Sequence, residues 1–390
     1  MSRNGNTKTV AVAMSGGVDS SVAAALLSQQ GYRVIGLTMR LWDVSEDNAA
    51  LGVVRGCCSM ESVSQAQRVC DTLKIPHYVV DMRHEFRQLV VDDFVSDYME
   101  GRTPNPCIRC NTFIKWQSLW NKARGLGADY LATGHYAKIV SDENGWHLYR
   151  ADFRAKDQSY ALWGIPRNQL STTLFPLGDK KKPEVRQIAR DLGLGNAETP
   201  ESQDICFVPS SGYQDLLKER IPDRLKQGKV KNTSGKIIGQ HDGFQLFTIG
   251  QRRGLKIALG KPAYVTKIIP KTNTVILGDR SDVLSTTFLA NEVNWTQPLS
   301  REKKNTTINQ KTLDIAGHKN IIMRNKGWVD AEVKIRYLHK QAKAKIKILP
   351  NNKVEVKFRQ PQFAITPGQA AVFYKGDNVL GGAWIKEVIK

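Results

Sequence analysis

The sequence has no apolar run long enough to cross a membrane. A spanning helix needs roughly 18 or more consecutive apolar residues, and no stretch of this chain provides them. The start, Met1 to Lys8, has no apolar signal core, and a candidate strand follows it directly. We therefore expect a cytoplasmic protein without a membrane partner.

Cysteine is also scarce. The 390 residues include six, at positions 57, 58, 70, 107, 110 and 206. Six are too few for a disulfide-stabilised scaffold in a chain of this size. In a reducing compartment, clustered cysteines are better interpreted as catalytic or metal-binding.

Acidic residues are outnumbered by basic ones. The chain has 57 Lys and Arg against 37 Asp and Glu, which gives a formal net charge of +20. Such a field favours a polyanionic partner, because basic side chains release condensed counterions from nucleic acid. The net charge does not distinguish a DNA partner from an RNA partner. The simpler alternative to a nucleic-acid partner is that many of the lysines are solvated surface residues.

The order of expected elements favours an α/β fold at the start of the chain. Strands are expected at Val10–Met14, Arg33–Leu41, His77–Met82 and Tyr130–Gly134, and helices at Asp19–Gln30, Ser62–Leu73, Phe86–Met99 and Asn111–Gly125. Strands that alternate with helices predict a doubly wound parallel sheet, here over residues 1–213.

The pattern of expected secondary structure changes after a short expected helix at Tyr213–Glu219. Short strands with Gly and Pro turns predict a small central β-rich domain over residues 214–285, which we expect to bind tRNA. Alternating strands then predict an antiparallel barrel or sandwich over residues 286–390, which we also expect to bind tRNA. The polar stretch near 296–325 is expected to be an irregular surface loop.

The stretch "VAVAMSGGVDSSVAAALLSQQGY", residues 10–32, predicts a strand, a glycine turn and a helix. Gly16 and Gly17 let backbone N–H groups approach an anion, and the helix N-terminus adds partial positive charge. Hydroxyls of nearby serines can donate as well. The simpler alternative is a tight turn in which Ser or Asp caps the helix.

This turn lacks the Gly-Lys-Ser/Thr ending of an ordinary nucleotide-triphosphate loop. Without a Lys to reach the β- and γ-phosphates, it suits a pyrophosphate leaving group better than γ-phosphoryl transfer. Asp19 can help to hold Mg²⁺. Residues Ser15–Ser20 resemble the PP-loop of ATP pyrophosphatases, which cleave ATP between the α- and β-phosphates. That superfamily includes small-molecule synthetases and amidotransferases, which remain an alternative.

Five further stretches narrow the resemblance. They are "GRTPNPCIRCNTFIKW" (101–116), "LATGHYAKI" (131–139), "AKDQSYAL" (155–162), "ESQDICFVP" (201–209) and "FTIGQRRGL" (247–255). Together they resemble the tRNA-specific 2-thiouridylases over essentially the whole chain, except for the polar stretch near 296–325. The resemblance implies a sulfurtransferase that adenylates the C2 oxygen of the wobble uridine, then replaces it with sulfur and releases AMP and pyrophosphate.

The resemblance also implies contact residues. The nucleotide would meet Ala13, Met14, Ser15, Gly16, Gly17, Val18, Asp19, Ser20, Met39 and Gly134, with Met39 against adenine. The tRNA anticodon stem-loop would meet His135, Lys156, Asp157, Gln158, Arg336, Tyr337 and Gln369, while Asn105, Pro106 and Cys107 border the flipped-out uridine. Unpaired anticodon bases enter a pocket at low unstacking cost.

Thiolation needs a sulfur donor and a second thiol to release the sulfur. Cys110 is expected to lie in a Pro-rich loop just before a helix, where the helix N-terminus and Arg109 would lower the pKa of its thiol. By resemblance, Cys206 carries the persulfide and Cys110 is the nucleophile, which leaves a Cys110–Cys206 disulfide. A cysteine desulfurase or sulfur-relay protein would supply the sulfur.

One position departs from the best-known form of the family, which has Asp where this sequence has Cys107. Cys107, Cys110 and Cys206 could then ligate a [4Fe–4S] cluster, as in iron–sulfur-dependent tRNA thiolases. A zinc site completed by Cys57, Cys58 or a His is a further alternative. In a plain persulfide relay, Cys107 has no sulfur chemistry. Cys70 is expected to be a core residue.

Overall fold

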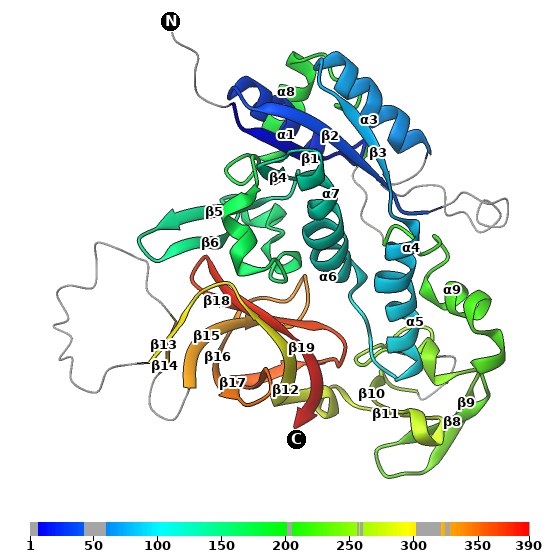
Figure 1. The fold of residues 1–390 in the computed structure, drawn as a ribbon. Helices are drawn as coiled ribbons and strands as arrows, with labels where there is room; N and C mark the ends of the chain where they lie inside the picture. Colours follow the sequence, from blue (N-terminus) through cyan, green and yellow to red (C-terminus); the bar gives the residue numbers. More distant parts are fainter. Residues whose placement is uncertain are drawn as a thin grey trace, which may run out of the picture. The chain divides into compact units, whose positions relative to one another are not determined.

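The computed structural model describes residues 7–42, 60–200, 205–255, 257, 260–301, 321–323 and 328–389. The chain divides into two compact units (Figure 1). The first contains Met1–Val91, Pro106–Ser210 and Asp377–Val379, and the second Asp92–Asn105, Ser211–Gly376 and Leu380–Lys390. The second unit therefore includes α5 (Asp92–Met99), which the sequence-based division assigned to the first domain. The division at 213 and 285 stays a prediction.

A five-stranded sheet forms the first unit. Its order is β3 (His77–Asp81), β2 (Arg33–Arg40), β1 (Thr9–Ala13), β4 (Tyr130–Ala132) and β7 (Thr173–Leu174), and all four pairings are parallel. The apolar run of β1 is buried along its whole length, as expected for a central strand covered on both faces. The predicted doubly wound sheet is confirmed.

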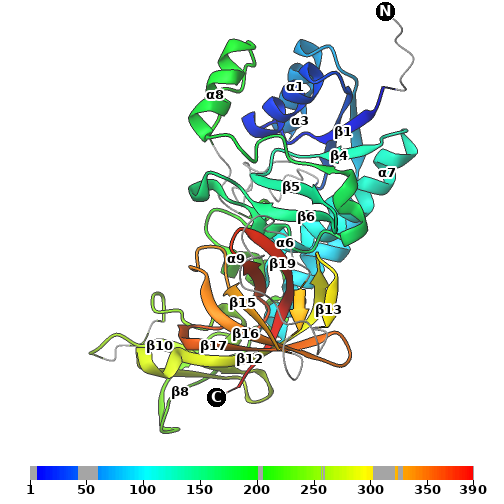
Figure 2. The ribbon, with the colours of Figure 1, turned by 90° about the vertical axis from the view of Figure 1, so that its left-hand side faces the viewer.

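Helices cover both faces of this sheet. On one face, α1 (Val18–Gln29) contacts α3 (Met60–Thr72) and α8 (Lys182–Asp191), and its Ala and Ser side chains allow close packing. Figures 1 and 2 both show α7 (Trp120–Gly125) on the opposite side of β1 and β4. Because the chain order reverses between β1 and β4, this sheet has its switch point there, where α/β proteins bind ligands.

Two helices begin earlier than the sequence predicts, and this part of the prediction is wrong. The helix expected from Phe86 begins at Arg83 and runs through α4 (Arg83–Phe86), a π-helical turn (Arg87–Val91) and α5. The helix expected from Asn111 begins at Pro106, in α6 (Pro106–Arg109), and continues through a π-helical segment (Cys110–Leu119) into α7. Proline suits the first helical position because its missing N–H has no helical partner there.

An antiparallel hairpin, β5 (Ala137–Asp142) and β6 (Gly145–Arg150), follows β4 in the first unit. The sequence interpretation missed it. The hairpin pairs with the first residue of β19 through Tyr149 and Asn378. Among the described residues, no helix is both long and apolar enough to span a membrane.

The second unit contains a closed six-stranded barrel. Strand order is β12 (Leu284–Trp295), β17 (Lys353–Phe363), β16 (Ala342–Leu349), β15 (Trp328–Lys334), β18 (Ala370–Lys375) and β19 (Asn378–Ile389), and β19 pairs back with β12. The inward residues of each strand build one apolar core that includes Phe288 and Phe373. The predicted antiparallel C-terminal β-structure is confirmed as a barrel.

A smaller sheet precedes the barrel, in the order β10 (Tyr264–Ile269), β11 (Thr274–Gly278), β8 (Gly228–Asn232) and β9 (Ile237–His241). It follows α9 (Tyr213–Arg220) and has its own core around Val230 and Val265. The stretch expected to be irregular contains two short parallel strands, β13 (Leu299–Arg301) and β14 (Ile321–Met323). The intervening residues 302–320 lie outside the described part of the chain.

Candidate nucleotide and thiol site

The glycine turn after β1 is stabilised by hydrogen bonds of its own serines. Gly16 has a φ of +74°, and a Cβ there would lie 2.5 Å from the Ser62 carbonyl oxygen of α3, so this position requires glycine. The Ser20 hydroxyl accepts from the Ser15 N–H at 3.2 Å and donates to the Gly17 carbonyl at 3.0 Å. Met14, expected to end the strand, lies just beyond β1, with its N–H donating to the Leu37 carbonyl.

The helix that follows the turn begins at Val18, with Gly17 in the capping position. Glycine has no side chain to satisfy the first-turn N–H groups, so the helix N-terminus keeps its donors and partial positive charge for an anion. Ser21 does not cap it, because its hydroxyl donates to the Gly17 carbonyl at 3.0 Å. The local geometry is thus that of a phosphate cradle.

Gly134 follows β4 and lies against the first turn of α1. A Cβ on Gly134 would come 2.6 Å from both the Asp19 carbonyl carbon and the Ser20 nitrogen. This is a backbone-to-backbone approach that only glycine permits, at the switch point of the sheet. The predicted nucleotide residue Gly134 therefore lies beside the loop, and its predicted contact with the nucleotide stays a prediction.

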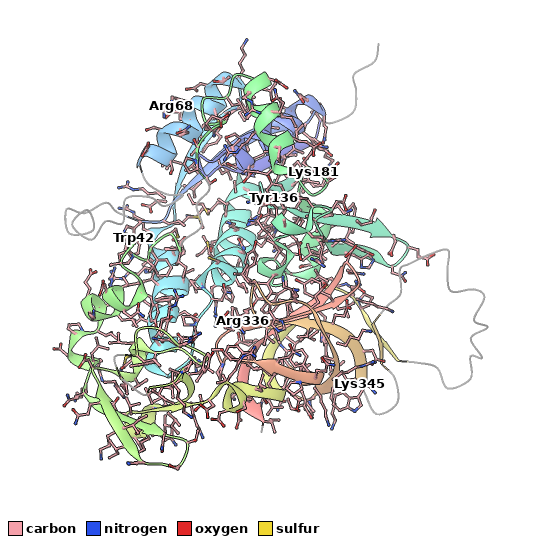
Figure 3. The ribbon with its side chains drawn as sticks, turned by 180° about the vertical axis from the view of Figure 1, so that it is seen from behind. Trp42, Arg68, Tyr136, Lys181, Arg336 and Lys345 are labelled. Atoms are coloured by element: carbon pink, nitrogen blue, oxygen red, sulfur yellow. The ribbon has the colours of Figure 1, made fainter. Side chains whose placement is uncertain are left out.

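Asp19 is bonded to two side chains that the sequence interpretation missed. The Lys182 ammonium lies 2.7 and 2.8 Å from the two Asp19 carboxylate oxygens, and the Tyr136 hydroxyl donates to one of them at 2.8 Å. Lys182 is the first residue of α8 and its side chain is only 10% exposed. Figure 3 labels Tyr136 and also Lys181, the residue that precedes Lys182 in the sequence. The only sequence signal was the lysine run of "GDKKKPEV".

Asn196 supports the loop from behind and was also missed. It is fully buried, and its amide donates to the Gly16 carbonyl at 2.9 Å and to the Ser21 hydroxyl at 2.8 Å. No local pattern could have revealed a contact with a loop 180 residues away.

Met39 and Ala13 lie at the carboxyl ends of β2 and β1, on the edge of the sheet where the loop begins. Both are buried, at 8% exposure each. In parallel sheets this edge is where ligands bind. The predicted contact between Met39 and adenine is compatible with this placement and stays a prediction.

The candidate thiols Cys110 and Cys206 both belong to the first unit, and both are partly exposed. Cys206 is followed by buried Phe207, whose ring lies 5.7 Å from that of Phe86 and 6.4 Å from that of Trp42. These ring contacts anchor the short segment that carries the Cys206 thiol.

Cys107 and Cys110 lie within the helical segment that begins at Pro106, so the predicted loop position of Cys110 is wrong. Cys107 is exposed. The segment is fixed against the first unit because the Asn111 amide donates to the Ala161 carbonyl at 2.9 Å, and the Thr112 side chain fills the space over Gly164. Cys57 and Cys58 lie outside the described residues, and Cys70 is buried as expected.

A metal-binding arrangement is not found in the part of the chain that the structure describes. No group of three or more His, Cys, Asp or Glu side chains there could hold a metal ion. The described positions of Cys107, Cys110 and Cys206 thus do not fit a three-thiolate cluster site. Asp19, the residue expected to meet Mg²⁺, has Lys182 as its partner.

The predicted RNA residues near β4 differ in their surroundings. The Nδ1 of His135 forms a hydrogen bond of 2.7 Å with the Thr133 hydroxyl. Burial holds the pKa of His135 well below its ordinary value, so the imidazole ring is neutral. Asp157 is buried against Arg150 at 2.9 Å. Gln158 accepts from the Tyr136 N–H, and Lys156 is partly exposed. Their contacts with tRNA stay predictions.

The remaining predicted RNA residues belong to the second unit, except for Pro106 and Cys107. Gln369 donates at 3.0 Å to both the Thr103 and Pro104 carbonyls, so the barrel supports the segment that leads to Asn105. Arg336 donates to the Phe363 carbonyl at 2.7 Å, and Tyr337 is 43% exposed (Figure 3 labels Arg336).

Comparison with known proteins agrees with this geometry. Residues 8–210 match the family described as tRNA methyl transferase HUP domain, residues 214–279 the tRNA methyl transferase PRC-barrel domain, and residues 308–385 the aminomethyltransferase beta-barrel domain. A protein of Carboxydothermus hydrogenoformans named tRNA-specific 2-thiouridylase MnmA is 44% identical, covering 97% of this chain and 98% of its own. One of the same name from Geotalea uraniireducens is 44% identical, covering 100% and 98%.

The parallel sheet with a glycine loop at its switch point defines a nucleotide-binding α/β protein. The chain belongs to the tRNA-specific 2-thiouridylase family. The resemblance drawn from the motifs is therefore confirmed, and these relatives give no support to a small-molecule synthetase.

The Gly134 contact yields a prediction. In Gly134→Ala the new methyl group meets backbone, so the start of α1 must shift, and overpacking of this kind costs about 1–3 kcal/mol. We expect ATP affinity, measured by isothermal titration calorimetry, to fall about tenfold or more. Gly125→Ala is the control, because apart from its chain neighbours and its own helix backbone no described atom lies within 4 Å of its Cβ position. Equal ATP affinity in the two variants would contradict the proposed approach.

Proposed function

We propose that this protein is a tRNA 2-thiouridine synthase that activates the wobble uridine with ATP and replaces its C2 oxygen with sulfur. The observation that carries the proposal is the combination, in one folded unit, of a glycine turn at a helix N-terminus with two partly exposed cysteines, Cys110 and Cys206. The names of the full-length relatives support it. A small-molecule synthetase would need the loop but neither thiol.

The first step uses ATP as a substrate. The uridine C2 oxygen attacks the α-phosphorus, the bond from this phosphorus to the α–β bridging oxygen breaks, and the electron pair leaves with pyrophosphate. The turn at Ser15–Ser20 binds the phosphates through backbone N–H groups and the start of α1. The C2 oxygen becomes part of a good leaving group, AMP.

The second step uses the thiols. A desulfurase or sulfur-relay protein places a persulfide on Cys206, and the Cys110 thiolate attacks the Cys206 sulfur. The sulfur–sulfur bond of the persulfide breaks, sulfide leaves with the electron pair, attacks C2 and displaces AMP. A Cys110–Cys206 disulfide remains, and an external thiol reductant restores both cysteines with two electrons and two protons.

Metal ions have a limited place in this proposal. Mg²⁺ would accompany ATP and neutralise phosphate charge, with Asp19 as the residue expected to meet it. The relay needs only two thiols, whereas a cluster needs three thiolates that the described residues do not group. We therefore propose the relay.

The barrel supplies a surface suited to RNA. Lys345 on β16 and Lys357 on β17 are exposed and directly opposite each other in the strand register (Figure 3 labels Lys345). Like charges in this position destabilise a sheet by some tenths of a kcal/mol, so a bound phosphate would relieve the repulsion. Lys347, two residues along β16, opposes Glu355 of β17, whereas the acidic residue opposite Lys345 is Asp330 on its other neighbour, β15.

The proposed function is tested by the products. Wild-type protein should release AMP and pyrophosphate from ATP only when tRNA is added, and Asp19→Asn should slow this release about a hundredfold. Thin-layer chromatography of α- and γ-labelled ATP separates the products, and circular dichroism checks the fold. Release of ADP and phosphate by the wild type would refute the assignment.

The cysteines separate the relay from a cluster. In the relay, Cys110→Ser and Cys206→Ser abolish activity, while Cys107→Ser keeps most of it because Cys107 has no sulfur chemistry. The measurement is 2-thiouridine formed by each single variant, with and without oxygen. An oxygen-labile wild type that all three substitutions inactivate would eliminate the relay and support a cluster.

The opposed lysines predict a characteristic trade-off. Lys357→Gln should raise stability slightly by removing the repulsion, yet lower tRNA affinity and reduce the salt slope of binding by about 0.9 per lost phosphate contact. Lys74→Gln, a substitution of an exposed lysine of the first unit, should leave the slope unchanged. Filter binding from low to high salt measures both. An unchanged slope in Lys357→Gln would remove this surface from the RNA site.

A further inference from the structure

The peptide between Gly16 and Gly17 lies within the glycine turn, and a single buried side chain bonds to it. The Asn196 amide donates to the Gly16 carbonyl at 2.9 Å, across 180 positions of sequence, and to the Ser21 hydroxyl at 2.8 Å. We infer that Asn196 is a positioning residue that fixes the peptides of this turn with their N–H groups directed toward the phosphates of ATP. The inference rests on the proposed binding of ATP phosphates by the turn.

The direction of the Gly17 N–H follows from the planarity of the peptide. In a trans peptide the C=O and the N–H of the next residue point in opposite directions. A Gly16 carbonyl held by Asn196 therefore directs the Gly17 N–H away from Asn196. There the Gly17 nitrogen lies 3.4 Å from the Ser15 hydroxyl oxygen, a long contact that a phosphate oxygen can replace. The Gly17 donor is thus kept available for an anion.

The second donor of Asn196 extends this control to the next peptide. Ser21 has one hydroxyl proton, which it donates to the Gly17 carbonyl at 3.0 Å, so its oxygen accepts from Asn196. The Val18 N–H belongs to the same peptide plane as the Gly17 carbonyl and points the opposite way. Successive backbone N–H groups directed out of a turn are the donors of an anion-binding nest.

The hydrogen bonds of Asn196 indicate that its two donors are the reason for an amide at this position. The residue is fully buried, and its amide oxygen has no hydrogen-bond partner among the described residues. A buried acceptor without a partner is costly, and an apolar residue of the same shape would avoid that cost. The reverse orientation of the amide would set its oxygen against the Gly16 carbonyl oxygen, so only the orientation described suits both neighbours.

The two glycines make such a constraint necessary. Because neither has a Cβ to restrict its backbone, the peptide between them can rotate at low cost. A rotated peptide would present the Gly16 carbonyl oxygen to the phosphates and repel them. The affinity for a ligand falls in proportion to the fraction of the protein in the binding-competent form. Loss of the Asn196 donors should therefore weaken the binding of phosphate groups and leave the binding of the nucleoside unchanged.

The experiment measures binding of inorganic pyrophosphate, ATP and adenosine to the full chain by isothermal titration calorimetry. Asn196→Leu keeps the approximate shape but removes both donors. It should bind pyrophosphate and ATP about tenfold more weakly, and adenosine with a change of less than about twofold. Asn196→Asp should lose at least as much, because an ionised carboxylate only accepts. Leu27→Ala, a cavity variant in the last turns of α1, controls for lost stability and should bind pyrophosphate like the wild type.

A pair of variants at Ser21 keeps the test decisive if the Asn196 variants do not fold. Ser21→Thr and Ser21→Val add nearly the same volume at this fully buried position, but only Thr retains the hydroxyl that joins Asn196 to the Gly17 carbonyl. We expect Ser21→Thr to bind pyrophosphate about threefold or more tightly than Ser21→Val. Equal affinity of these two would overturn the inference. So would a folded Asn196→Leu that binds pyrophosphate like the wild type, or one that loses affinity for adenosine and pyrophosphate equally.

The outcome is separable from that of the proposed function. If the wild type binds ATP and pyrophosphate but forms no 2-thiouridine, the proposed function fails, and the variants still decide the role of Asn196. If the wild type makes AMP and pyrophosphate and Asn196→Leu binds both phosphate ligands normally, only the role of Asn196 fails.

Discussion

The first unit depends on one close approach, that of the end of β4 to the start of α1. Gly134 brings backbone against backbone at the switch point of the sheet, and no side chain fits between them. This contact places the end of β4 beside the first turn of α1, whose N–H groups have no partner within the helix. It also brings Tyr136, two residues later, within hydrogen-bond distance of Asp19.

The loop is then held by parts of the chain that come much later. Lys182 contacts its acidic residue, Asn196 donates to the Gly16 carbonyl, and both residues come from the α8 region. The glycines supply permissive backbone, but they do not supply rigidity. Rigidity comes from buried hydrogen bonds such as those of Asn196, and the proposed phosphate site depends on such preorganisation.

The thiols are supported differently. Cys206 is anchored by the ring contacts of Phe207, and Cys110 by a helical segment that starts at Pro106. Within the second unit, Gln369 and Thr248 hold the residues that lead to that segment, since they bond to Thr103 and Pro104. Residues far apart in sequence thus hold the stretch Thr103–Pro104 in place.

The sequence alone was sufficient for the parallel sheet, the antiparallel C-terminal strands and the family, because these depend on local periodicity and on short motifs. It also pointed to Ser15–Ser20, Cys110 and Cys206, whose residue types are dictated by the chemistry. It could not place Lys182, Asn196 or Tyr136 at the loop, since each contact spans more than a hundred residues and leaves no local pattern. Only tertiary packing decided that Lys182 of α8 lies against Asp19 and Asn196 against Gly16.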